Sequence, residues 1–127
     1  MRTYKLYSGN VNATASNITS TQILRNGIIK RIRWALSVDS VTDNAELAME
    51  LSVNPVSQVG LATIQGAFDE IRWAGNFATS GLAQGGVNAT RDLDFPVGAG
   101  EFMYLNAYVA GTLVGHATIF VDVQEGK

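Results

Sequence analysis

The sequence predicts an all-β fold: a single-domain antiparallel β-sandwich or jelly roll of about eight strands. Apolar and polar residues alternate along most of the chain, which is the pattern of half-buried strands. Turn-forming Asn, Gly and Pro residues recur roughly every ten residues, and no long segment has the period of an amphipathic helix. Long connections at residues 9–21 and 79–90 favour a jelly roll over a simple up-and-down order.

Length and composition are those of one ordinary domain, residues 1–127. Of these residues 46% are hydrophobic and 16% are charged, and none is cysteine. A chain of this size buries roughly two-thirds of its unfolded surface, so it needs no disulfide or metal to fold. The formal net charge of −2 argues against a nucleic-acid-binding protein. A charge fraction below the usual ~25% favours a surface that partly faces another subunit.

No segment suggests a membrane protein or a secreted one. The first ten residues lack the apolar stretch of a signal peptide. No apolar run reaches the ~18 residues that a membrane span needs. We therefore expect a protein that is made in the cytoplasm and is used there or carried away in an assembly.

Residues 1–20 form a candidate N-terminal arm. Arg2 to Ser8 alternates loosely, as either an edge strand or an arm paired with a neighbouring subunit would. The polar stretch that follows predicts a loop with one short strand near Ile18. Asn26-Gly27 then predicts a turn before the next strand.

The clearest alternation runs from Ile28 to Val53 and predicts a central β-hairpin. If its strands pair about residues 41–42, Trp34 lies opposite Met49, and Arg33 lies opposite Glu50 on the other face. The residues expected to face the core are Ile28, Ile32, Trp34, Leu36 and Val38, then Leu47, Met49, Leu51 and Val53.

The second half of the chain predicts four more strands. Residues 59–65 could form a helical turn, and the stretch 80–90 predicts a glycine-rich loop. The residues expected to face the core are Ile71, Trp73 and Phe77, then Leu93, Phe95 and Val97, then Met103, Leu105, Ala107 and Val109, and finally Ala117, Ile119, Val121 and Val123.

The sequence offers little support for catalysis. His116 is the only histidine, so neither a catalytic triad nor a histidine-based metal site has its partners. Asp92 with Asp94, or Asp69 with Glu70, could form an acid–base pair as in glycosidases. Solvent-exposed charge explains these carboxylates equally simply.

A calcium site is the remaining metal hypothesis. Asp39, Asp43 and Asn44 could supply oxygen ligands, but they lack the alternating D-x-D-x-D-G pattern and are ordinary turn formers. We expect no enzyme activity, no cofactor and no metal, and a melting temperature that chelators leave unchanged.

Two groups of side chains are candidates for contact with a partner. The basic residues at 25–33 would either pair with Glu46 and Glu50 or dock on an acidic partner. An aromatic stripe lies on the outward face of two late strands, where a subunit contact, a covering loop or a ligand platform would explain it. With two tyrosines of the N-terminal segment, the candidate contact residues are Tyr4, Tyr7, Arg25, Lys30, Phe102, Tyr104, Tyr108, His116 and Phe120.

Three stretches carry a resemblance to a known family: RIRWALSVDS, LAMELSV and FPVGAGEFMYLNAYVAGTLVGHATIFVDV. With their basic-aromatic strand, their AG-E turn and their closing hydrophobic strand, they resemble the small jelly-roll decoration (cement) proteins on the heads of tailed bacteriophages. The resemblance implies a homotrimer on the lattice of the major capsid protein, which strengthens the shell of the virion without catalysis. It implies no contact with nucleic acid or membrane.

The main alternative is a carbohydrate-binding or receptor-binding β-sandwich domain of the phage fibre or spike type. Such a domain would stack sugar rings on exposed aromatic side chains such as Tyr104 and Tyr108. A small hydrolytic enzyme is a third hypothesis. Mass in solution helps to separate them, because decoration and fibre domains should be trimers and a carbohydrate module is usually a monomer.

Overall fold

The structure of the chain, a computed structural model, describes residues 1–12, 15–41, 45–54, 67–75 and 85–126. These residues form eight β-strands and no helix, which confirms the all-β prediction. No helix among them is long and apolar enough to span a bilayer. The strands are β1 (Arg2–Asn10), β2 (Ala15–Gln22), β3 (Gly27–Val41), β4 (Ala45–Asn54), β5 (Ala67–Gly75), β6 (Gly85–Val97), β7 (Phe102–Ala110) and β8 (Leu113–Glu125).

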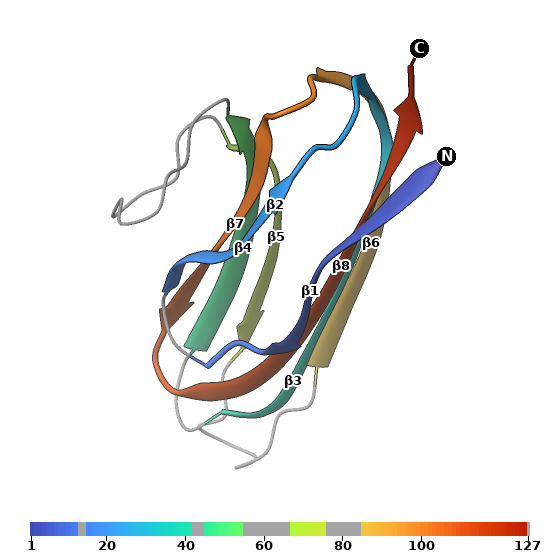
Figure 1. Ribbon diagram of the computed structural model, residues 1–127. Helices are drawn as coiled ribbons and strands as arrows, with labels where there is room; N and C mark the ends of the chain where they lie inside the picture. Colours follow the sequence, from blue (N-terminus) through green and yellow to red (C-terminus); the bar gives the residue numbers. More distant parts are fainter. Residues whose placement is uncertain (13–14, 42–44, 55–66, 76–84, 127) are drawn as a thin grey trace.

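The strands form two antiparallel sheets that pack face to face (Figure 1). Sheet A has the order β1-β8-β3-β6, and sheet B has the order β2-β7-β4-β5. Only β4 and β5 are consecutive in the chain and also neighbours in a sheet. Every other connection crosses from one sheet to the other, as in an eight-stranded jelly roll. The sandwich and its jelly-roll order are therefore as predicted.

One hydrophobic core lies between the sheets, and alternation predicted most of it. Trp34 is buried, as expected, and the inward residues of β4, β7 and β8 are almost all fully buried. The largest of the completely enclosed side chains come from both sheets, as expected where the inner faces of a sandwich interdigitate. They include Ile29, Ile32 and Leu36 of β3, Leu47, Met49 and Leu51 of β4, Met103 and Leu105 of β7, and Ile119 of β8.

The predicted hairpin between β3 and β4 is wrong. β3 pairs with β8 and β6, whereas β4 pairs with β7 and β5. Trp34 therefore lies opposite Ile119 and Ala89 instead of Met49. The chain crosses from sheet A to sheet B after β3, so the apolar faces of β3 and β4 belong to opposite walls of the core. Alternation identifies inward residues, but it does not distinguish neighbours in one sheet from residues across the core.

A β-bulge reverses the predicted orientation at the start of β3. The register of β3 against both neighbours shifts between Ile29 and Arg31. Ile29 is fully buried and Ile28 is 38% exposed, the opposite of the prediction. An extra residue in one strand shifts the phase of the alternation. Lys30 and Arg31 consequently lie side by side on the outer face of sheet A, where both line the same depression.

The N-terminal segment is an edge strand of its own chain. β1 pairs with β8 from Arg2 to Asn10, and Leu6 is buried in the core. Residues 15–22 form β2 at the edge of sheet B. Within this chain the segment is thus the edge strand that the sequence allows, and the arm that pairs with a neighbouring subunit stays a prediction.

The last six residues of the glycine-rich loop predicted at 80–90 are part of a strand. Residues 85–90 belong to β6 and pair with residues 33–38 of β3. The predicted helical turn at 59–65, the rest of the loop and Phe77 lie outside the described residues. The side chains of Trp73 and Asp39, and all of Asp43 and Asn44, also lie outside them.

Asn26 joins three segments at one end of the sandwich, which we call the Asn26 end. Its side-chain oxygen accepts a hydrogen bond from Ala99 N at 2.9 Å in the β6–β7 turn. Its carbonyl oxygen accepts one from Gly126 N at 2.7 Å beyond β8. The following Gly27 is needed for space, because a Cβ there would lie 2.6 Å from the carbonyl oxygen of Gln124. The Asn-Gly pair thus lies where the chain enters sheet A, with Gly27 as the first residue of β3 in place of the predicted turn.

Candidate functional site

The predicted aromatic stripe is divided between opposite sides of the molecule. Phe102, Tyr104 and Tyr108 lie on β7 in sheet B, whereas His116 and Phe120 lie on β8 in sheet A. All five have the outward parity that the sequence predicts. The connection from β7 to β8 crosses between the sheets, so the two groups cannot form one surface.

On sheet B the aromatic side chains do not form an open platform. Tyr104 is 0% exposed, and its neighbour Ser52 on β4 is buried as well. The ring of Phe102 lies 6.0 Å from the ring of Tyr104 at an interplanar angle of 30°. Tyr108 alone of the three is well exposed, at 51%. The face therefore has a ring enclosed by the chain itself, not a stacking surface.

The two N-terminal tyrosines stabilise their own chain. Tyr4 is buried, and its hydroxyl oxygen accepts a hydrogen bond from Leu24 N at 3.2 Å. The Tyr7 hydroxyl donates to the carbonyl oxygen of Asn10 at 2.6 Å. Tyr4 is therefore enclosed, whereas Tyr7 is only partly buried against the core.

On the outer face of sheet A, the ring of Phe120 lies beneath the guanidinium group of Arg33. The guanidinium carbon of Arg33 is 5.0 Å from the centroid of the Phe120 ring, within the range of a cation–π interaction. Arg33 also donates to Asp122 at 2.9 Å, and Thr3 donates to the same carboxylate oxygen at 2.6 Å. The expected pairing of Arg33 with Glu50 is wrong, because the two residues lie in different sheets. Lys5 lies opposite Phe120 on its other side.

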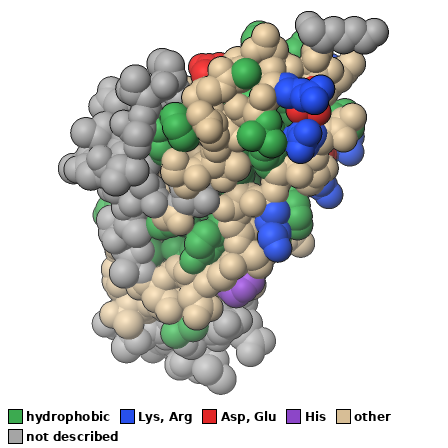
Figure 2. Space-filling view, in the orientation of Figure 1, with side chains coloured by type: hydrophobic (Ala, Val, Ile, Leu, Met, Phe, Trp, Pro, Cys, Tyr) green, Lys and Arg blue, Asp and Glu red, His purple; other side chains and the backbone are tan. Residues whose placement is uncertain are grey.

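Two further candidates lie apart from this cluster. His116 is half-buried on the outer face of sheet A, opposite Ser37 and Asn10. Arg25 is exposed at the Asn26 end and forms no ion pair within the described part of the chain. Figure 2 shows the Lys and Arg side chains gathered along the flank of the molecule formed by sheet A, with the histidine below them.

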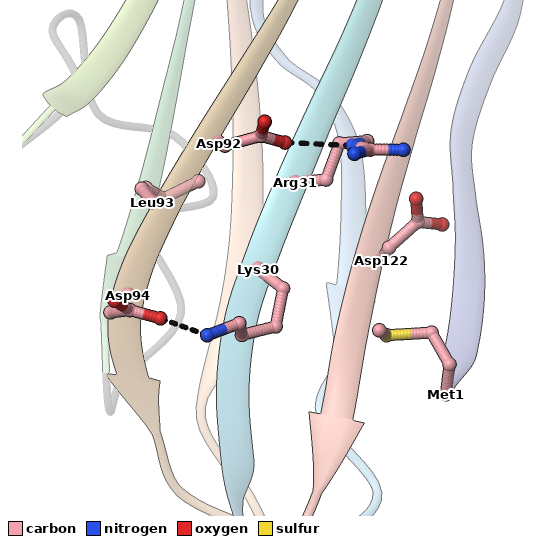
Figure 3. A pocket seen from close by; sticks show the side chains of 7 residues that line it. All are labelled: Met1, Lys30, Arg31, Asp92, Leu93, Asp94 and Asp122. Atoms are coloured by element: carbon pink, nitrogen blue, oxygen red, sulfur yellow. Dashed lines mark hydrogen bonds and ion pairs between the residues drawn. The ribbon is translucent and has the colours of Figure 1, made fainter.

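Lys30 is not the unpaired cation that the sequence suggested. It pairs with Asp94, and Arg31 pairs with Asp92 at 2.7 Å. The hydrogen bond and charge of Asp92 raise the pKa of Arg31 above its ordinary value. These pairs join β3 to β6 on the outer face of sheet A, and Figure 3 shows them at the rim of a depression.

The depression has a volume of about 470 Å³. Met1 lies at one side, at the start of β1, and Leu93 lies at the other, on β6 (Figure 3). Between them are the two ion pairs and Asp122 of β8. The depression therefore collects charged side chains from three neighbouring strands and two apolar ones.

Asp69 has a role that sequence reasoning missed. Its side chain is only 8% exposed and accepts from Trp34 Nε1 at 2.7 Å and from Arg91 at 2.7 Å. The carboxylate lies on β5 of sheet B, and both donors lie on sheet A, so it links the sheets. Its parity with Ile71, two residues later, was the available signal that it faces inward.

The carboxylates considered for catalysis are thus engaged in ion pairs. Asp92, Asp94 and Asp69 each have a cationic partner, and Glu70 pairs with Arg72 at 3.4 Å. Within the described ranges, no three His, Cys, Asp or Glu side chains lie together as metal ligands would. Comparison of the sequence with protein-family models and with curated proteins finds no match.

Proposed function

We propose that this protein is a structural protein of the bacteriophage virion. It decorates the capsid as a homotrimer and stabilises the lattice of the major capsid protein without catalysing a reaction. It is made in the host cytoplasm and then carried on the capsid surface. The jelly-roll fold supports the proposal, because viral capsid domains use it, as does the resemblance noted from the sequence. Other proteins share this fold, so the argument also needs a surface.

The observation that carries the proposal is the apolar surface at the Asn26 end. Leu24 is 59% exposed and Ile28 is 38% exposed, and Met1 is also exposed. Met1 and Ile28 adjoin the same end of β8, and Tyr4 of β1 bonds to Leu24. Arg25 lies among them. Exposed apolar groups gathered at one place are typical of surfaces that another protein covers, and arginine is enriched in such contacts.

Strand pairing along β6 is a poor route to assembly. This edge of sheet A carries Asp92, Asp94 and Pro96. Charges and proline on an edge strand discourage the addition of another strand. Packing of side chains at the Asn26 end is therefore better supported than strand pairing along β6. A stable interface of this kind buries more than about 1,000 Å².

Sedimentation velocity tests the proposal with a matched pair of variants. Leu24→Ser removes an apolar side chain from the Asn26 end, and Val114→Ser removes one that is 44% exposed at the opposite end. We expect the intact chain and the Val114→Ser variant to sediment as trimers and to co-pellet with capsids. The Leu24→Ser variant should do both less well. If the intact chain is a monomer at high micromolar concentration, the trimer is wrong and the capsid proposal loses its main support.

A further inference from the structure

We propose that the depression on the outer face of sheet A binds a neutral carbohydrate. The proposal concerns a site that adjoins the apolar surface at the Asn26 end and shares only Met1 with it. It also differs from the stacking site expected at Tyr104 and Tyr108, because Tyr104 is enclosed.

The side chains around the depression are held in place by the sheet. Lys30 and Arg31 project from the bulge in β3, Asp92 and Asp94 from β6, and Asp122 from β8. Without the bulge, consecutive residues of a strand would point to opposite faces. The bulge therefore brings two cations to one side, each beside its own carboxylate.

The charges favour a neutral ligand. Lys30 is matched by Asp94, Arg31 by Asp92, and Asp122 by Arg33. A bound anion would compete with the carboxylates for their cations, and a metal ion would compete with the cations for the carboxylates. A ligand without charge can be held while all three pairs remain intact.

The polar atoms that the ion pairs do not use match the hydroxyl groups of a sugar. Arg31 uses only Nε towards Asp92, and no described residue takes up its two terminal nitrogens. Asp92 and Asp94 each use only Oδ1 in their pairs. Donors thus lie beside acceptors, and adjacent sugar hydroxyls can both donate and accept. Hydrogen bonds to charged groups are stronger than neutral ones.

The size and the apolar residues fit the same class of ligand. A depression of about 470 Å³ lies within the range of roughly 300–1,000 Å³ found for small-molecule sites. Met1 offers its methyl group to the C–H face of a sugar ring, whereas Leu93 adjoins the depression but packs against the core. No aromatic ring lines the depression, so single sites should bind weakly. Several copies in one assembly would raise the overall affinity through multivalency.

Saturation-transfer NMR on the full chain tests the site. The probes are D-glucose, D-galactose, D-mannose and N-acetyl-D-glucosamine, each at tens of millimolar. The Lys30→Ala/Asp94→Ala variant removes one ion pair of the site. The matched control, Arg72→Ala/Glu46→Ala, removes a pair of 2.8 Å on the outer face of sheet B. Exposed ion pairs contribute little to stability, so both variants should remain folded, which their amide spectra will show.

We expect at least one sugar to give transfer with the intact chain and with the control. The Lys30→Ala/Asp94→Ala variant should bind that sugar at least tenfold more weakly. Inorganic phosphate and calcium chloride, titrated against amide spectra, should shift the signals around the depression less than the sugar does. The site is wrong if no sugar binds, if both variants bind equally, or if phosphate or calcium proves the stronger ligand. Each of these results leaves the trimer and capsid experiments unaffected.

Discussion

The outer faces of the two sheets differ in the contacts and the burial of the side chains that point away from the core. On sheet A these side chains form ion pairs between adjacent strands, and the Phe120 ring lies under Arg33. On sheet B, Tyr104 and Ser52 are completely buried although they also point outward. Acidic residues predominate there, with Glu50 directly opposite Glu70. Sheet A thus presents paired charges, and sheet B encloses an aromatic ring.

The difference shows that orientation and exposure are separate properties of a strand residue. Alternation places Tyr104 and Phe120 on outer faces in the same way. Tyr104 is nevertheless enclosed, whereas Phe120 is half-buried. Four experiments would break or sharpen this contrast.

The largest effect is expected for the enclosed ring. Tyr104→Ala removes a fully buried aromatic side chain, whereas Phe120→Ala removes a half-buried one. We expect the first to lower the free energy of unfolding by about 3–5 kcal/mol, as for other large-to-small changes at buried sites. The second should cost less than half as much. Urea denaturation measures both, and equal losses would contradict the difference between the faces.

The next largest effect is expected where the two sheets are joined. Asp69→Ala leaves Trp34 Nε1 and Arg91 without their shared acceptor. A buried donor left unsatisfied costs about 1–3 kcal/mol. Asp92→Ala is the control, because its carboxylate is exposed. Thermal melts should show a clear destabilisation for the first variant and little change for the second. The reverse order would show that Asp69 does not link the sheets.

A smaller effect is expected for the contact between Arg33 and Phe120. Cation–π pairs at exposed sites contribute about 0.5–1 kcal/mol. A double-mutant cycle with Arg33→Ala and Phe120→Leu should give a coupling free energy in this range. Arg33 also bonds to Asp122, and the cycle separates that contribution from the ring contact. If the two substitutions change the free energy of unfolding additively, the Phe120 ring and the Arg33 cation do not interact energetically.

The smallest effect is expected at the exposed tyrosine of sheet B. Tyr108 is 51% exposed, and surface substitutions usually change stability by less than ~0.5 kcal/mol. The Tyr108→Ser variant should therefore have the same melting temperature as the intact chain. A loss as large as that of Tyr104→Ala would mean that both tyrosines of this face are enclosed.

The local pattern of the sequence predicted the strands and most of the core. In a half-buried strand every second residue is apolar and faces the core, so the sequence itself shows which face is buried. The inward residues of β8, from Ala117 to Val123, are an example. The pattern did not predict which strands pair. Lys30 and Asp94 are 64 residues apart in the chain, so the depression depends on the β3–β6 pairing, which the hairpin hypothesis did not predict.

The bulge in β3 could not be predicted either. Ile28 and Ile29 are both apolar, so the alternation fits equally well with either of them facing the core. One inserted residue in the pairing decides which of the two enters the core. The candidate contact residues of β7 and β8 were selected by outward parity alone. Parity could not show that Tyr104 is enclosed, or that Phe120 and Tyr108 lie on opposite sides of the molecule.

The place of β8 in sheet A has a consequence for synthesis of the chain. β8 is the last of the eight strands to be made, yet it lies between β1 and β3 and pairs with both. Sheet A therefore cannot close while the polypeptide is still being extended through β7. During that time β1 and β3 carry unpaired edges, which are prone to join other chains. Folding of this protein thus waits for its final strand, and many copies made together at one site would aggregate most readily before β8 emerges.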